Sequence, residues 1–213
     1  MSLFRLDASI RSQGSVSRAL ADVVEASWRE TRPDAPVTHR DLGVEPLDAR
    51  AWALAVTARQ VPTPSAEQQA AVDLATELVD ELIDADALLF AVPLYNFGIS
   101  QHVKTWVDLV LTDPRLAAAG ERPLAGRPAV AVVVVRGGAY GPGTPREGWD
   151  HASGWIRRIL ADVWGLDLRV VEREFTLVGV NPALDEFIEL ADTMRHEAER
   201  LAAQHGRHLA GVR

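Results

Sequence analysis

Short apolar runs alternate with longer amphipathic segments along this chain, and this alternation constrains the fold more than any other feature of the sequence. Two runs, Ala87–Val92 and residues 129–135, are continuously apolar. Such runs are typical of strands that are buried on both faces of a parallel sheet. Weaker runs predict three further strands, over residues 3–8, 36–42 and 168–171, the last running on toward Phe175.

Apolar side chains recur at helical spacing between these strands, which predicts helices over residues 16–30, 65–84, 99–111, 148–163 and 182–204. Ser65 and Gln68 carry the signature of a capping box at the start of the second helix. Strands that alternate with helices form right-handed crossovers, which give a parallel sheet with helices on both faces. We therefore expect an α/β protein with a doubly wound, five-stranded parallel sheet in one domain over residues 1–205.

Two stretches have no periodicity that predicts an element. Residues 206–213 are expected to form a frayed C-terminal tail. Residues 43–64 contain three prolines and are expected to be irregular. We expect this stretch to pack over a sheet edge or against a partner subunit.

Composition excludes several functions. The chain has 213 residues, a formal net charge of −8 and no cysteine. A nucleic-acid binder needs a basic surface, so no nucleic-acid partner is expected. Without cysteine there are no disulfides, iron–sulfur clusters, thiolate zinc sites or cysteine nucleophiles. Lys104 is the only lysine, so the Gly-Lys-Ser/Thr end of a P-loop is absent.

Other classes of site and location are equally disfavoured. The six histidines show no metal-binding spacing such as H-E-x-x-H, and no G-x-S-x-G elbow is present, so neither a metal site nor a serine hydrolase is expected. The first ten residues include Arg5 and Asp7 and lack a signal-peptide core. No apolar run reaches the roughly 18 residues of a membrane helix. We expect a cytoplasmic protein with no membrane partner.

The loop after the first strand offers an anion site. Ligands bind such sheets at the carboxyl ends of the strands. Here the hydroxyls of Ser9, Ser15 and Ser17 lie at the start of a helix, where unpaired N–H groups and the helix dipole favour an anion, and Arg11 adds charge. The alternative is plain helix capping by Ser15 or Ser17. Because G-x-G-x-x-G is absent, a terminal monophosphate suits the loop better than a dinucleotide pyrophosphate.

The loop after the third strand is the most informative stretch of the chain. Tyr95 and Phe97 flank Asn96, and two rings beside an amide suit a flat heteroaromatic ligand. The alternative is that the two rings cover the core while Asn96 caps the following helix.

The residues after the second and fourth strands are weaker indications of a ligand site. After the fourth strand, Gly137 and Gly138 allow backbone N–H groups to approach a ligand, or else form a flexible surface loop. Asp41, after the second strand, is interpreted as a turn residue rather than a ribose-binding acid.

Together these segments resemble the FMN-dependent NADH:quinone and azo-compound reductases, the azoreductase family of the flavodoxin-like superfamily, over nearly the whole chain. Residues 8–9 with 14–18 resemble the phosphate loop of that family, and residues 40–42 resemble the end of its second strand. Residues 93–99 with Lys104 and Asp108 resemble its most diagnostic motif. Residues 136–140 resemble its strand-four loop. The resemblance implies the flavodoxin-like strand order 2-1-3-4-5.

The resemblance also implies roles for the matching residues. The FMN phosphate would be held by Ser9, Ser15 and Ser17, and Arg11 and Val16 are further candidates for binding the cofactor. The isoalloxazine would be lined by Pro93, Leu94, Tyr95, Asn96 and Phe97, and its pyrimidine edge addressed by Arg136, Gly137 and Gly138. Tyr140 is a further candidate for binding the cofactor. Tyr140 or His151 would protonate the acceptor, unless both are surface residues.

The implied activity transfers a hydride from NADH or NADPH through flavin N5 to a quinone, azo compound or related small-molecule acceptor, in a ping-pong cycle. The family acts as a homodimer, to which residues 43–64 with Trp52 would contribute. The chain departs from the family over residues 112–120 and at Ala161 and Asp162, which border the acceptor site in the family. A flavodoxin-like electron carrier and a tailoring flavoenzyme with a reshaped acceptor pocket therefore stay open as alternatives.

Overall fold

A five-stranded parallel sheet forms the centre of the molecule. The computed structural model describes residues 1–117, 121–135 and 137–211. The strands are β1 (Leu3–Asp7), β2 (Val37–Asp41), β3 (Ala87–Val92), β6 (Pro128–Val135) and β7 (Asp167–Arg173). Their order is β2-β1-β3-β6-β7, and all neighbours are parallel. This confirms the expected fold class and the order 2-1-3-4-5 of the five long strands.

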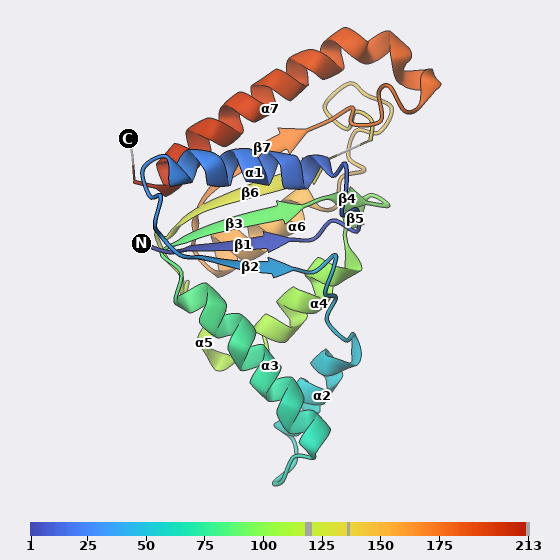
Figure 1. Cartoon of the computed structure of the whole chain (residues 1–213). Coiled ribbons are helices and arrows are strands. Elements are labelled where there is room, and N and C mark those ends of the chain that lie inside the picture. The colour runs from blue at the N-terminus through green and yellow to red at the C-terminus, as the bar shows by residue number, and fades with distance from the viewer. Residues whose placement is uncertain (118–120, 136, 212–213) are drawn as a thin grey trace.

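Helices cover both faces of the sheet (Figure 1). On one face lie α1 (Val16–Arg29) and α7 (Ile188–Leu209), with Leu89 and Ala91 of β3 directed toward them. On the other face lie α3 (Ala66–Ile83), α4 (Gln101–Val110) and α6 (Ser153–Arg157), which pack on Leu88 and Phe90. Alternate residues of β3 enter opposite cores because side chains alternate along a strand. The continuous apolar run therefore indicated a strand buried on both faces.

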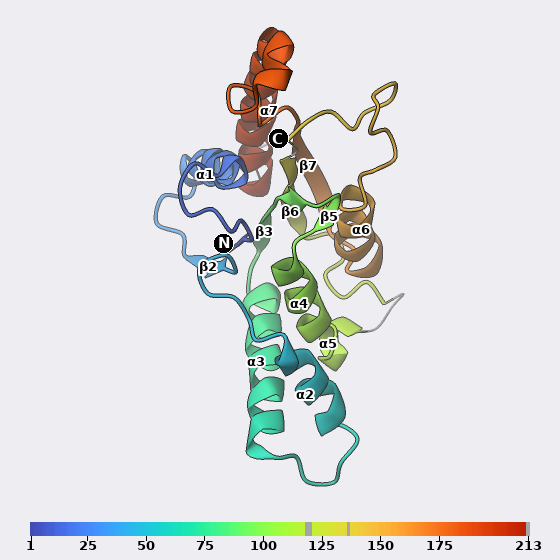
Figure 2. The same ribbon diagram turned by 90° about the vertical axis from the view of Figure 1, so that its right-hand side faces the viewer.

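The stretch over residues 43–64 contains a helix that the sequence analysis missed. Helix α2 (Arg50–Ala58) buries Ala51, Ala55 and Ala58 and packs against α3 and α4 rather than over a sheet edge. Figure 2 shows α2 and α3 side by side below the sheet. Alanines give a weak periodic signal, although their small side chains allow close helix packing.

The loop after β3 forms a β-hairpin. Strands β4 (Leu94–Tyr95) and β5 (Gly98–Ile99) are joined by Asn96 and Phe97, whose φ angles of +47° and +68° are those of a type I′ turn. Helix α4 therefore begins two residues later than expected, and Ser100, not Asn96, is its N-cap. The short helix α5 (Pro114–Ala117) follows α4.

The last two helices differ from expectation at their ends. The fourth begins at Ser153 and continues from α6 as a π-helix, η1 (Arg158–Val163). The fifth begins with a 3₁₀ turn, η2 (Pro182–Phe187). Helix α7 then runs to Leu209, and both Leu209 and Ala210 are buried. The frayed tail expected from residue 206 is therefore wrong up to Ala210.

The reason that this end is ordered is a close contact between α7 and α1. A Cβ on Gly206 would lie 2.3 Å from the carbonyl oxygen of Val24, so the glycine allows the two helices to touch.

Candidate functional site

The loops after β1, β3 and β6 meet at one edge of the sheet, to the right in Figure 1. The Ser9 hydroxyl lies 3.2 Å from the Tyr95 hydroxyl, and that hydroxyl also accepts a hydrogen bond from the Ile10 N–H. These contacts join the serine loop to the hairpin across 86 residues of sequence. The expected site is therefore formed from segments that lie far apart in the chain.

The serine loop presents hydroxyls and backbone N–H groups at the start of a 14-residue helix. Ser15 caps α1 by accepting from the Arg18 N–H, so the capping alternative holds for this residue. Its hydroxyl also lies 3.2 Å from that of the buried Ser17. Val16 and Ser17 occupy the first turn, where backbone N–H groups have no acceptor within the helix. Capping and anion binding are thus compatible here.

Arg11 and Asp41 take different places around this loop. The Arg11 side chain is exposed, and the backbone N–H of Arg11 donates to the Ser9 hydroxyl. Asp41 accepts hydrogen bonds from the N–H groups of Gly43 and Val44, which confirms it as a turn residue.

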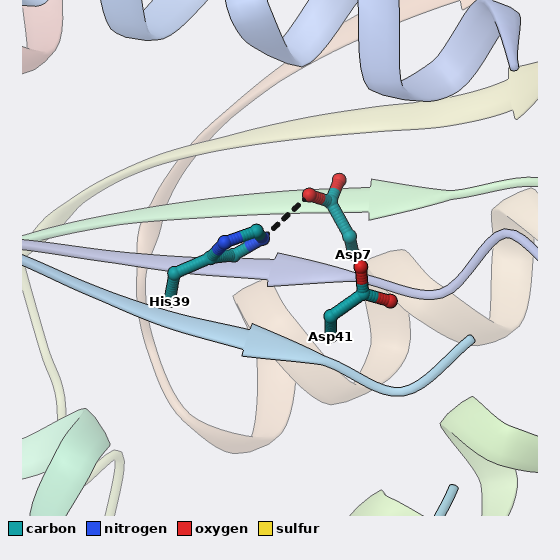
Figure 3. A group of neighbouring side chains, drawn as sticks. All are labelled: Asp7, His39 and Asp41. Carbon is teal, nitrogen blue, oxygen red and sulfur yellow. Dashed lines mark hydrogen bonds and ion pairs between the residues drawn. The ribbon is translucent and has the colours of Figure 1, made fainter. Parts of the chain in front are cut away.

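A cluster of titratable side chains lies beside the loop. Ligand atoms of Asp7, His39 and Asp41 all fall within 4.8 Å of one another. Figure 3 shows these side chains and the hydrogen bond between His39 and Asp7. Asp7 Oδ1 is buried and has no hydrogen-bond partner within the described ranges. However, Arg5 lies 3.0 Å from Asp7, and Arg18 lies 2.5 Å from Asp41 and 3.6 Å from Asp7, so both carboxylates already pair with guanidinium groups. We interpret the cluster as an ion network, because a divalent cation would be repelled by both arginines.

The hairpin carries an exposed aromatic pair. Phe97 is 39% exposed, which contradicts the alternative that it covers the core. Its ring meets the edge of Trp149 at 5.3 Å between centroids and 82° between planes. The backbone N–H of His151 donates to the Phe97 carbonyl oxygen at 2.9 Å, which fixes the segment after β6 to the hairpin. Trp149 was not predicted as a site residue, since its only signal in the sequence was its position in the loop after a buried strand.

The rest of the hairpin is less accessible. Pro93 and Leu94 are buried, Tyr95 is half-buried, and Asn96 is exposed at the turn.

The glycines after β6 are held by the segment after β7. The Gly137 carbonyl oxygen accepts a hydrogen bond from the Leu177 N–H at 3.3 Å, and the Gly138 carbonyl oxygen accepts one from the Phe175 N–H at 3.4 Å. The Glu174 carboxylate accepts from the Tyr140 N–H. These contacts attach the two glycines and Tyr140 to the segment after β7. Arg136 lies outside the described residues.

The two candidate proton donors differ in exposure. Tyr140 is buried beside Phe97, with ring centroids 6.3 Å apart, whereas the His151 side chain is exposed. The alternative that both are surface residues is therefore wrong for Tyr140.

The chain departs from the family at two places, neither of which lies in the loops after β1, β3 and β6; residues 118–120 of the first place lie outside the described residues. Residues 112–117 follow α4 at its end opposite the hairpin, where Arg115 pairs with Asp80 of α3. Ala161 and Asp162 lie in η1, near the start of β7. The expectation that these positions border the acceptor site concerns a cleft between two subunits, so it stays a prediction.

The comparison with known proteins decides the family. Residues 1–188 match the protein family described by a flavodoxin-like fold. The chain belongs to this flavodoxin-like family. An FMN-dependent NADH:quinone oxidoreductase of Frankia casuarinae is 40% identical over 94% of this chain and 96% of its own length. An FMN-dependent NADH:quinone oxidoreductase of Streptomyces avermitilis is 36% identical over 98% of this chain and 96% of its own length.

A solved structure shows the same flavodoxin-like fold. The FMN-dependent NADH-azoreductase of Bacillus anthracis, in complex with FMN, superposes with a TM-score of 0.71 at 16% identity, covering 96% of this chain and 99% of its own. The curated relatives confirm the family resemblance that the serine loop and the hairpin motif carry. Among the described residues, no helix is long and apolar enough to cross a membrane.

Proposed function

We propose that this chain is an FMN-dependent NADH:quinone oxidoreductase of the azoreductase type. The contact between Ser9 and Tyr95 carries the proposal, because it joins an anion-binding loop and an aromatic hairpin into one site. Relatives of 40% and 36% identity are named for this activity.

The serine loop fits a single phosphate monoester. Ser9, Ser15 and Ser17 supply hydroxyls, and the first turn of α1 supplies the N–H groups of Val16 and Ser17. Arg11 lies at the exposed rim, where it can add a positive charge. The loop has no glycine-rich pyrophosphate cradle, which favours FMN over a dinucleotide.

The hairpin and the glycine loop fit the ring of the same cofactor. The isoalloxazine would be lined by Pro93, Leu94, Tyr95, Asn96 and Phe97, with Arg136, Gly137 and Gly138 at its pyrimidine edge. When bound, FMN would supply the two-electron chemistry, with a hydride from NADH or NADPH received at N5. Donors at the pyrimidine edge would stabilise the negative charge of the reduced ring.

One cleft would serve both half-reactions, which predicts ping-pong kinetics. Phe97 and Trp149 would form the wall of this cleft, and exposed rings favour planar aromatic acceptors such as quinones and azo compounds. Tyr140 and His151 are the proposed proton donors to the acceptor.

We also propose that two copies of the chain form the active unit. Trp52 on α2 is 47% exposed, and Val44 and Val61 in the same stretch are exposed as well. Exposed apolar side chains in one segment are typical of subunit interfaces. Light scattering of the purified protein is expected to give twice the monomer mass.

A visible absorbance spectrum tests the function. The protein is mixed with FMN, excess flavin is removed, and NADH or NADPH is added without oxygen. Retained flavin absorbance that bleaches with nucleotide is expected. Retained flavin that neither nucleotide bleaches would instead support the electron-carrier alternative, and loss of the flavin would overturn the proposal.

A further inference from the structure

We infer that Arg18, Asp41 and Gly43 form a support beneath the serine loop, so that Arg18 positions the phosphate-binding groups without contacting the phosphate. The inference rests on the proposed function, since it concerns the affinity for FMN. Arg18 stands directly after the serines, where an arginine would ordinarily be interpreted as a phosphate ligand.

The contacts of Arg18 engage each of its guanidinium nitrogens. Nε donates to the Arg11 carbonyl oxygen at 3.1 Å, and Nη2 donates to the Ser9 carbonyl oxygen at 2.9 Å. Nη1 and Nη2 donate to the two carboxylate oxygens of Asp41 at 2.5 and 2.7 Å. The side chain is 14% exposed. The guanidinium therefore holds both ends of the turn that begins the loop.

Asp41 fixes this guanidinium from the end of β2. Its carboxylate also accepts from the backbone N–H groups of Gly43 and Val44, so the turn after β2 and the guanidinium share one acceptor. The Leu42 N–H donates to the Asp7 carbonyl oxygen, which continues the pairing of β1 with β2 up to this turn. Burial opposes the charged carboxylate, but the hydrogen bonds from Arg18 and the backbone outweigh it and lower the pKa of Asp41.

Gly43 completes the support by direct backbone contact. A Cβ at this position would lie 1.9 Å from the Ser9 carbonyl oxygen and 3.0 Å from Arg18 Nη2. The turn after β2 thus touches the serine loop at the residue whose hydroxyl meets Tyr95. Only glycine allows this approach.

The two roles of Arg18 predict opposite effects of one substitution. If Arg18 contacted the phosphate, Asp41→Asn would remove a competing anion and strengthen FMN binding. If Arg18 supports the loop, Asp41→Asn frees the guanidinium to move and weakens FMN binding. Arg18→Lys separates the roles again, because lysine binds phosphate well but cannot reach three separate acceptors.

The test titrates the apoprotein with FMN and with riboflavin, which lacks the phosphate, and follows flavin fluorescence. Arg18→Lys, Arg18→Met and Asp41→Asn are each expected to raise the Kd for FMN about tenfold or more. The double variant Arg18→Met with Asp41→Asn is expected to resemble the single variants, because both act through one support. Riboflavin binding is expected to change less than FMN binding.

Arg40→Met is the matched control. Arg40 precedes Asp41 on β2 and pairs with Glu77 and Glu81 of α3, away from the serine loop. The Arg40→Met variant is expected to bind FMN with a Kd within about twofold of that of the wild type. Tighter FMN binding by Asp41→Asn, unchanged binding by Arg18→Lys, or equal losses in Arg40→Met would each overturn the support. A wild type that binds no FMN would instead overturn the proposed function.

Discussion

The two ends of the candidate site are held by different interactions. At the phosphate end, backbone carbonyls of the serine loop bind the largely buried Arg18. At the ring end, Phe97 and Trp149 meet through a ring edge and remain 39% and 50% exposed. A residue in close contact with the backbone cannot be enlarged without moving the backbone, whereas an exposed side chain can rotate or be replaced. Under the proposed function, the phosphate end would be a fixed anchor for the cofactor, whereas Trp149 would be free to vary without loss of the cofactor.

The same substitution at a glycine of each end gives the largest expected difference. Gly43→Ala places a methyl group 1.9 Å from the Ser9 carbonyl oxygen, so the loop must shift and FMN binding is expected to weaken about 100-fold or more. Gly137→Ala places one 2.6 Å from the end of the Leu177 side chain, which is 39% exposed and can move. Its Kd for FMN is expected to change less than about threefold.

Fluorescence titration with FMN measures both glycine variants. Gly154→Ala serves as the control, since a Cβ there meets nothing within 4 Å and FMN binding should not change. Equal losses at Gly43 and Gly137 would show that the two ends do not differ in this way.

Removal of the Trp149 indole is expected to weaken the binding of substrates in the cleft but not the binding of FMN. Trp149→Ala deletes half of the exposed aromatic pair, so the KM for a planar quinone is expected to rise about tenfold. FMN retention is expected to stay unchanged, whereas the rate at which NADH bleaches the flavin is expected to fall as well, because both substrates use this cleft in turn. Stopped-flow absorbance separates the two half-reactions, and Trp149→Phe is expected to restore most of the quinone affinity. A slower reaction with NADH, at normal quinone KM, would contradict this role.

Features that depend on neighbouring residues could be predicted from the sequence, whereas contacts between distant segments could not. The strands and the serine loop were predictable because burial on two faces and helix capping act through neighbouring residues. The contact of Phe97 with Trp149 and the pairing of Arg18 with Asp41 were not, because each joins separate segments that only the fold brings together. Helix α2 was missed because packing of its alanines on α3 and α4, rather than a strong periodic pattern, accounts for it.

The smallest expected effect is the pH dependence of the Arg18–Asp41 pair. The folded state lowers the pKa of Asp41, so the unfolded chain binds a proton more readily as pH falls. The pair therefore contributes stability that is fully present above the ordinary aspartate pKa of about 3.9 and is lost as pH falls through the folded value. At pH 7, the free energy of unfolding of the wild type is expected to exceed that of the Asp41→Asn variant by about 1 kcal/mol.

Urea unfolding of the apoprotein between pH 7 and pH 3 measures this difference, which is expected to stay constant down to about pH 5 and to shrink below about pH 4. Asp48→Asn is the control, because Asp48 pairs with Arg50 in solvent and such exposed pairs contribute little to stability at any pH. A difference between wild type and Asp41→Asn that stays constant down to pH 3 would mean that the carboxylate of Asp41 adds no charge-dependent stability. The support beneath the serine loop would then depend on the shape of the turn at Gly43 rather than on the ion pair.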